Sequence, residues 1–151
     1  MAKNEIPYYT KDSRYAAVGA PAQNVWTNMI SSGANGSKLM HVGLKATYAI
    51  GASGTVDFRV ELGLWDGTTV HSITEKHFVL SNSAPLSTPS NTTAYTTGIN
   101  LLKEFGLPLD KNGNPNLNLP AGTSLRFQYS QSTSGTGSVT FSSIFAHLED
   151  Y

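Results

Sequence analysis

The feature that most constrains this chain is an alternation of apolar and polar side chains over eleven residues, from Met40 to Ile50. A repeat of two residues places alternate side chains on opposite faces of a strand, whereas an amphipathic helix needs a repeat of about 3.6. The segment therefore predicts a half-buried strand, straight or bent near Gly43, whose even-numbered side chains point inward.

A second alternating segment, residues 56–64, is followed closely by Asp66-Gly67. Asp-Gly is the favoured pair for a two-residue type I′ turn, because both central positions of that turn need positive φ. The sequence therefore predicts a tight hairpin here, with the even-numbered side chains of residues 56–64 facing the core.

The predicted turn also sets the pairing of side chains across the hairpin. It places Val60 opposite Ile73 and Asp57 opposite Lys76, so that apolar meets apolar and opposite charges meet. Farther from the turn the same register brings Phe58 against a charged glutamate. We therefore expect a bulge or an early end to the pairing near that end.

Shorter alternations predict further strands, which long polar segments separate. The expected strands are residues 24–30, 94–102, 124–129 and 139–148, with one helical turn at most at 103–105. In the last strand the apolar positions change from odd to even numbers around Ser142 and Ser143, which predicts a bulge. The loop of residues 81–93 suits a crossing between two sheets, as in Greek-key topologies.

Composition agrees with an all-β chain. Gly, Pro, Ser, Thr and Asn make up 65 of the 151 residues, more than a helical protein tolerates. We predict a single two-sheet antiparallel sandwich, jelly-roll-like, in residues 24–151, preceded by an extended N-terminal arm in residues 1–23. An immunoglobulin-like sandwich is the alternative, although its Cys and Trp spacing is missing.

Charge and cysteine counts exclude several function classes. Ten basic residues balance ten acidic ones, so we expect no nucleic acid and no anionic membrane as partner. Without cysteine the chain has no disulfide, no thiolate metal site and no cysteine nucleophile. The sequence shows no secretory signal and no membrane-spanning apolar run, so we expect synthesis and folding in a cytoplasm.

The nearest approach to a metal site is His71, Glu75 and His77, which have odd numbers on one predicted strand and would share a face. At about 3.3 Å per residue the two histidines would lie roughly 20 Å apart, too far to share one ion. Glu75 and His77, about 6.6 Å apart, are the only pair that could do so. We expect paired polar groups on a half-exposed strand, with no metal site and no cofactor.

Catalytic motifs are missing from the sequence. It contains no Gly-x-Ser-x-Gly elbow, no phosphate-binding Gly-rich loop and no dinucleotide-binding fingerprint. Asp57 and Glu61 would share a strand face, but Arg59 between them predicts salt bridges rather than a glycosidase pair. We therefore predict that the protein is not an enzyme.

Trp65 offers a different kind of site. It lies at the predicted hairpin tip, on the parity opposite to the apolar face of its strand. Its large ring would either contact a ligand or partner, or cover the end of the sandwich and contact another subunit.

Four features occur together: the N-terminal arm, KLMHVGLKATYAI, the hairpin VDFRVELGLWDGTTV, and LPAGTSLRFQYS before the last strand. In this combination the chain, from about residue 24 onward, resembles the small jelly-roll virion proteins of tailed bacteriophages, in particular head decoration (cement) proteins. No catalytic residues come with the resemblance.

The resemblance implies a homotrimer on the capsid surface that binds the major capsid protein and bridges capsid subunits. By mass action, a protein that binds only the assembled shell stabilises it. The expected partner-binding residues are Tyr8, Tyr9, Arg14 and Tyr15 of the arm, which would order on binding, together with Trp65. The charge-poor composition suits such subunit contacts.

Two other interpretations stay open. A carbohydrate-binding module or a receptor-binding fibre head would use the same sandwich, with Trp65 or the loops at 81–93 and 107–120 as its site. A metal-dependent sugar isomerase of the cupin type would need bound metal, although the His-x-His of cupins does not occur in this sequence.

Overall fold

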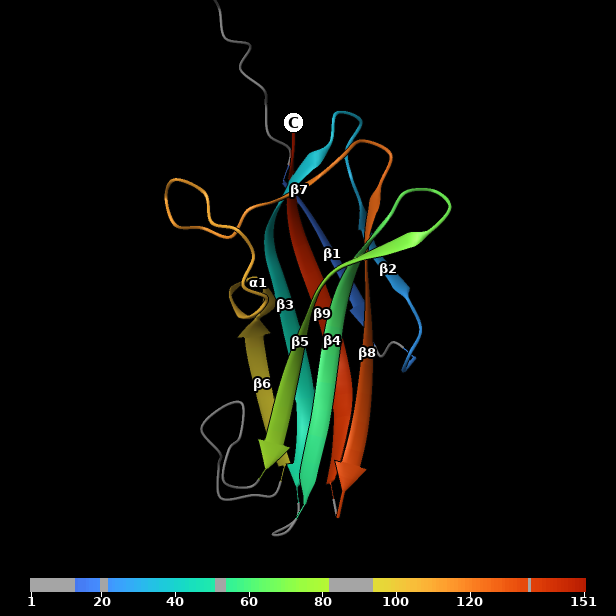
Figure 1. Ribbon diagram of the computed structural model, residues 1–151, viewed down its shortest axis with the longest axis vertical. Coiled ribbons are helices and arrows are strands. Elements are labelled where there is room, and N and C mark those ends of the chain that lie inside the picture. Colours follow the sequence, from blue (N-terminus) through green and yellow to red (C-terminus); the bar gives the residue numbers. More distant parts are fainter. Residues whose placement is uncertain (1–12, 20–21, 51–53, 82–93, 136) are drawn as a thin grey trace, which may run out of the picture.

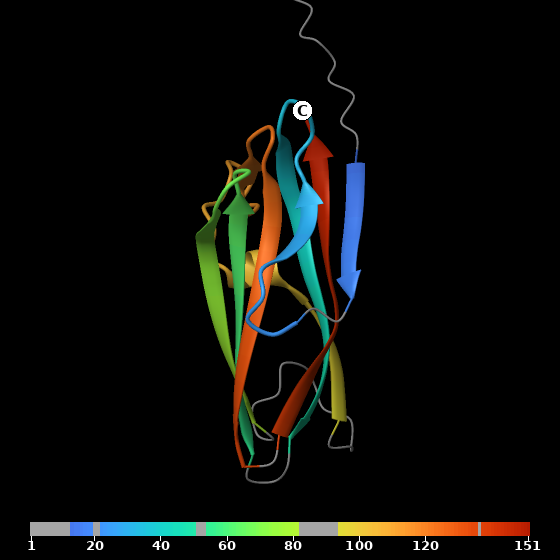
Figure 2. The same ribbon diagram turned by 90° about the vertical axis from the view of Figure 1, so that its right-hand side faces the viewer.

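A computed structural model describes residues 13–19, 22–50, 54–81, 94–135 and 137–151, which form two packed antiparallel sheets (Figure 1, Figure 2). In chain order the elements are β1 (Ser13–Gly19), β2 (Thr27–Ser31), β3 (Ser37–Ile50), β4 (Thr55–Trp65), β5 (Val70–Ser81), β6 (Ala94–Asn100), α1 (Leu101–Glu104), β7 (Leu117–Leu119), β8 (Ser124–Ser134) and β9 (Gly137–Asp150). No described helix has the length and apolar character needed to cross a membrane.

The order of the strands is that of a jelly roll. One sheet has the order β1-β9-β3-β6, with β7 also paired to β3, and the other has the order β2-β8-β4-β5. Apart from β7, early strands pair with late ones in reverse order: β1 with β9, β2 with β8, β3 with β6 and β4 with β5. This is a long antiparallel hairpin rolled into two sheets, so the predicted sandwich is confirmed. α1 begins at Leu101, two residues before the predicted helical turn, so β6 ends earlier than predicted. β5 and β6 lie in different sheets, as the predicted crossing requires.

Alternate side chains of the long strands fill the space between the sheets. In β4, Val56, Phe58, Val60 and Leu62 are fully buried, as their alternation predicted. The other main contributions come from β3, β8 and β9: Leu39, Val42, Leu44, Leu125, Phe127, Ile144, Ala146 and Leu148. One apolar core therefore lies between the two sheets.

Met40 departs from the predicted alternation of β3. The pairing of β3 with β9 shifts register between Leu39 and His41. As a result Leu39 is fully buried, whereas Met40 is 38% exposed. The inward position predicted for Met40 is therefore wrong, because a bulge reverses the parity of a strand. The side chains of Ala46, Tyr48 and Ile50, also predicted to point inward, lie outside the described part of the structure.

The hairpin loop between β4 and β5 is longer than the predicted Asp-Gly turn, since residues 66–69 all lie outside the strand pairing. Asp66 Oδ1 accepts hydrogen bonds from the N–H groups of Thr68 (2.8 Å) and Thr69 (2.9 Å). These bonds, with the Thr69 N–H the largest cause, hold the pKa of the Asp66 carboxyl well below its ordinary value. Gly67 has positive φ (104°) but Asp66 does not, so the type I′ prediction is wrong: the aspartate side chain closes the loop.

The longer loop changes the pairing across the hairpin. Val60, rather than Asp57, lies opposite Lys76, and Phe58 lies opposite Phe78. The two phenylalanine rings have centroids 6.0 Å apart, within the range of favourable aromatic pairs. The predicted register is therefore wrong. The pairing continues without a further shift to Thr55 and Ser81, so the bulge or early end expected near Phe58 is also wrong.

The bulge predicted in the last strand is confirmed. Lys45 pairs with Ser143 and Ala46 pairs with Phe141, so Ser142 is left as a bulge in β9. Beyond this bulge Ile144, Ala146 and Leu148 are buried, as predicted. The side chains of Val139 and Phe141, predicted to point inward before the bulge, lie outside the described part of the structure.

Part of the predicted arm belongs to the sandwich. Ser13–Gly19 forms β1, which pairs with β9 along its whole length. Its side chains alternate between exposed and half-buried, and Ala16 and Val18 pack against the core. The predicted arm boundary at residue 23 is therefore wrong, because β1 belongs to the sandwich. The inward side chains of β1 are small, so the alternation in its sequence is weak. Residues 1–12 lie outside the described residues.

Candidate functional site

The two outer faces of the sandwich carry different side chains. The polar face belongs to β4, β5 and β8 and is defined by Asp57, Arg59, Glu61, Glu75, His77 and Gln128. The aromatic face belongs to β1, β3 and β9 and is defined by Tyr15, His41, Phe145 and His147. The inner sides of these same strands share the apolar core, so the outward positions are free to differ.

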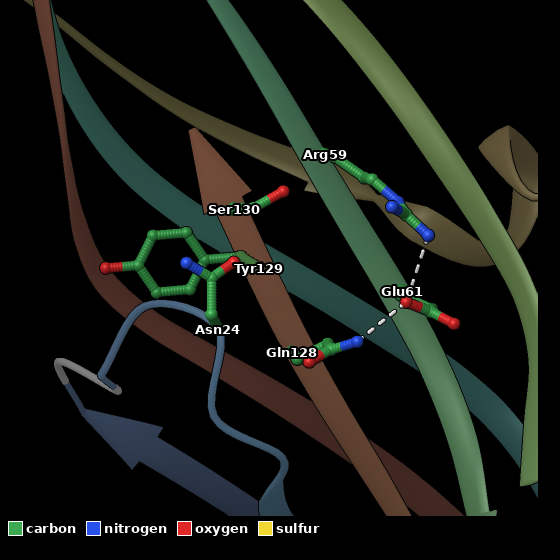
Figure 3. A pocket seen from close by; sticks show the side chains of 6 residues that line it. All are labelled: Asn24, Arg59, Glu61, Gln128, Tyr129 and Ser130. Atoms are coloured by element: carbon green, nitrogen blue, oxygen red, sulfur yellow. Dashed lines mark hydrogen bonds and ion pairs between the residues drawn. The ribbon is translucent and has the colours of Figure 1, made fainter. Parts of the chain in front are cut away.

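A buried carboxylate lies at the centre of the polar face. Glu61 is 8% exposed, and its Oε2 accepts hydrogen bonds from Arg59 Nη2 (3.2 Å) and Gln128 Nε2 (2.8 Å) (Figure 3). Ser72 donates a hydrogen bond to the other carboxylate oxygen. The salt bridge predicted between Arg59 and Glu61 is confirmed, and these partners compensate the carboxylate for its burial.

Glu75 and His77 lie beside each other on the same face. His77 Nε2 is 3.7 Å from Glu75 Oε1, and His77 Nδ1 is 3.6 Å from Asp57 Oδ1. Arg59 also contacts the Glu75 carboxylate. Within the described part of the chain, no group of three or more His, Asp or Glu side chains is arranged to hold a metal ion.

His71 lies away from that pair. The register shift between β4 and β5 leaves Ile73 as an extra residue, which reverses parity toward the loop. Ser72 consequently reaches Glu61 on the polar face, whereas His71 Nε2 lies 2.7 Å from Asp66 Oδ2. The prediction that His71 shares a face with Glu75 and His77 is therefore wrong.

Two adjoining hollows lie over β8 and β4 on the polar face. The smaller, about 40 Å³, is lined by Asn24, Arg59, Glu61, Gln128, Tyr129 and Ser130 (Figure 3). The larger, about 290 Å³, is lined by Gln23, Asn24, Asp57, Arg59, His77, Ser130, Gln131 and Ser132. Asn24, Arg59 and Ser130 line both hollows, so the two hollows adjoin each other.

Gln23 and Asn24, in the segment before β2, form part of the wall of these hollows. Asn24 has a left-handed φ of 59°, which asparagine tolerates better than most residues, and its N–H donates to Tyr129 O (2.8 Å). Gln23 Nε2 donates to Gln131 O (3.0 Å). The turn at these residues explains why β2 begins at Thr27, later than the predicted start at residue 24.

Trp65 lines a third hollow farther along the same two strands. This hollow of about 370 Å³ is also lined by Asn28, Ser31, Ser32, Gly122, Thr123, Ser124 and Arg126. The Arg126 guanidinium lies 4.1 Å from the centre of the Trp65 ring, a cation–π contact that orients it. Trp65 is therefore half-buried beside a polar cavity, in a position to contact a ligand.

The aromatic face presents stacked rings to solvent. Tyr15 stacks on His147 with ring centroids 4.2 Å apart, and His41 stacks on Phe145 at 5.2 Å. Tyr15 is 73% exposed and Phe145 38%. A Cβ on Gly43 would lie 2.0 Å from Phe145 Cζ, so the phenylalanine ring rests on the glycine backbone.

The two histidines of this face are electrostatically coupled. Burial lowers the pKa of His41 from its ordinary value, and repulsion from His147 lowers it further. The neutral form of His41 is therefore favoured in the folded protein.

The arm residues predicted to bind a partner have separate positions. The Arg14 guanidinium lies 2.6 Å from the Asp150 carboxylate and donates a hydrogen bond to Ser31 O (2.8 Å), so it joins the two sheets. Tyr15 lies on the aromatic face, while Tyr8 and Tyr9 lie outside the described residues.

Sequence reasoning missed both the aromatic face and the hollows. His41 and His147 are far apart in sequence, and only the pairing of β3 with β9 brings them together. The only signal in the sequence was the odd numbering of Phe145 and His147, opposite to that of the apolar side chains that follow Ser143. No protein-family model and no curated protein matches the chain.

Proposed function

We propose that this protein is a non-enzymatic structural protein of a virion: a decoration protein on the capsid surface that bridges capsid subunits. The observation that carries the proposal is the exposed aromatic face. Tyr15 and Phe145 leave large apolar surfaces in solvent, as does Met40 of β3. Exposed apolar patches of this kind mark interaction sites, and tyrosine and phenylalanine are enriched in interfaces.

The edge of β1 supports association through the same side of the molecule. β1 ends its sheet, and no described strand pairs with its outer edge. Its sequence, SRYAAVG, has neither the lysine nor the proline that often protects an edge strand. A second copy of the chain or a capsid subunit would therefore find both backbone groups and aromatic rings to contact.

The virion setting rests on the resemblance and on the jelly-roll topology, which occurs in viral capsid domains as well as in other proteins. In this setting copies of the chain form a homotrimer through the aromatic face. Residues 1–12, including Tyr8 and Tyr9, then contact the major capsid protein in its assembled state. Binding to the assembled shell alone stabilises that shell.

Light scattering tests the self-association. We expect the wild-type chain to be a trimer and the double variant Tyr15→Ser, Phe145→Ser to be a monomer. Val79→Ser is the matched control, since Val79 is 65% exposed on the opposite side of the molecule and its loss should leave the trimer intact. A monomeric wild-type protein would overturn the homotrimer.

Mass spectrometry of purified virions tests the setting. We expect the chain in intact particles of the virus that encodes it, and we expect deletion of residues 1–12 to abolish its binding to capsids without unfolding the sandwich. Particles that lack the chain would overturn the virion proposal. Undiminished binding after the deletion would overturn the role of the arm.

A further inference from the structure

The three hollows of the polar face lie in one line. Along β8 they are lined in turn by residues 124 and 126, by 128–130 and by 130–132, and along β4 by Trp65, then Glu61 and Arg59, then Arg59 and Asp57. From residue 124 to residue 132 the line extends about 26 Å at about 3.3 Å per residue. This length suits a linear ligand rather than a compact one. We name this line of hollows the track.

One tryptophan ring lines the track, and a second lies beside it. Trp65 lines the hollow at the end. A Cβ on Gly63 would lie 2.8 Å from Trp26 Cζ3, so the Trp26 ring rests on β4 between Glu61 and Trp65. Tryptophan rings offer apolar faces on which the C–H groups of a pyranose ring pack.

Neutral hydrogen-bonding side chains line both larger hollows. Asn28, Ser31, Ser32, Thr123 and Ser124 line one, and Gln23, Asn24, Ser130, Gln131 and Ser132 line the other. Hydroxyl and amide groups both donate and accept hydrogen bonds, as the hydroxyl groups of a sugar do.

The charges of the polar face select among hydroxyl-rich ligands. The carboxylates that line the hollows, Asp57 and Glu61, are balanced there by the guanidinium groups of Arg59 and Arg126. Without an excess of positive charge the track has no electrostatic attraction for a polyanion. An uncharged chain of hydroxylated rings does not need such an attraction.

We propose that the track binds a linear neutral oligosaccharide, with Trp65 packing against a sugar ring and the hydroxyl and amide side chains of the two larger hollows bonding to hydroxyl groups. This binding uses the face opposite to the one proposed for assembly. The two proposals can therefore fail independently.

Calorimetric titration of the full-length protein with maltohexaose, cellohexaose and chitohexaose tests the proposal. We expect saturable binding of at least one hexamer, about tenfold tighter than binding of the corresponding disaccharide, because a short ligand reaches only one hollow. Equal affinity for hexamer and disaccharide would overturn the track, and no saturable binding to any of the three would overturn the proposal.

Variants at the two ends of the track locate the binding. Trp65→Ala and Gln131→Ala should each weaken hexamer binding about tenfold, and Trp65→Phe should weaken it less. Leu109→Ala, at an exposed residue that lines none of the three hollows, is the control and should bind like the wild-type chain. Circular dichroism confirms that each variant is folded. Binding unchanged in both track variants, or seen only with hexagalacturonate and lost in high salt, would overturn the proposal.

Discussion

The polar face and the aromatic face are built on one core but solve the problem of an exposed sheet differently. On the polar face the side chains bond one another, and Glu61 is satisfied by three neighbours. On the aromatic face the rings stack in pairs and remain partly exposed. The inward side chains therefore specify the sandwich, whereas the outward side chains determine what each face can bind.

The largest expected effect tests whether the two faces share one core. Phe127→Ala should lower the free energy of unfolding by about 3 to 5 kcal/mol, because Phe127 is fully buried between the sheets. Phe145→Ala, on the aromatic face, should cost only about 1 kcal/mol. Urea unfolding of both variants measures the difference. Equal costs would mean that Phe145 is as much a core residue as Phe127.

The next effect compares the two glycines that lie under aromatic rings. Gly63→Ala should cost about 1 to 3 kcal/mol, because its Cβ would lie 2.5 Å from Cγ1 of Val70, whose branched side chain has little freedom. Gly43→Ala should cost less, because the half-exposed Phe145 ring can swing outward. Thermal melting of the two variants would contradict this order if Gly43→Ala were the less stable.

A smaller effect tests the loop that joins the two strands of the polar face. Gly67→Val should cost about 1 to 2 kcal/mol, because a β-branched residue tolerates a φ of 104° badly. No atom lies within 4 Å of a Cβ added there, so the cost is one of backbone conformation alone. Gly67→Asn should cost less, since asparagine adopts positive φ more readily. An unchanged melting temperature in Gly67→Val would mean that the loop relaxes freely.

The smallest effect is the pH dependence of the aromatic face. The pKa of His41 is lowered by folding, so below about pH 6.5 the unfolded chain takes up a proton that the folded chain resists. Stability should therefore fall as the pH drops from about 6.5 to the folded pKa, and stay lower beneath it. His41→Gln should remove this part of the slope when urea unfolding is followed between pH 7.5 and pH 5. A variant with the wild-type slope would exclude His41 as its source.

The pattern of burial along the long strands could be predicted from the sequence because alternation is a local property. Val56, Phe58, Val60 and Leu62 follow it without exception, and the change of face near Ser142 was visible in the numbering alone. The hairpin register could not be predicted in the same way. Asp-Gly permits several loops, and the Asp66 carboxylate selects a longer one by binding the backbone.

The candidate sites were less predictable than the strands. Trp65 and the Arg59–Glu61 salt bridge were visible, because each follows from positions on a single strand. The hollows were not, since they combine β4 and β8 with the segment around Asn24. Met40 shows the same limit, because a single bulge exchanges the inward and outward sides of a strand.

The sequence by itself determined that this protein is an all-β sandwich, because a repeat of two residues admits no other burial of its apolar side chains. Only the tertiary structure decided which strands are neighbours, where the bulges fall and that β1 joins the sheet. Pairing depends on contacts between distant segments, such as β1 with β9. Those contacts place Tyr15 beside His147 and Glu61 beside Gln128, and so create the two faces.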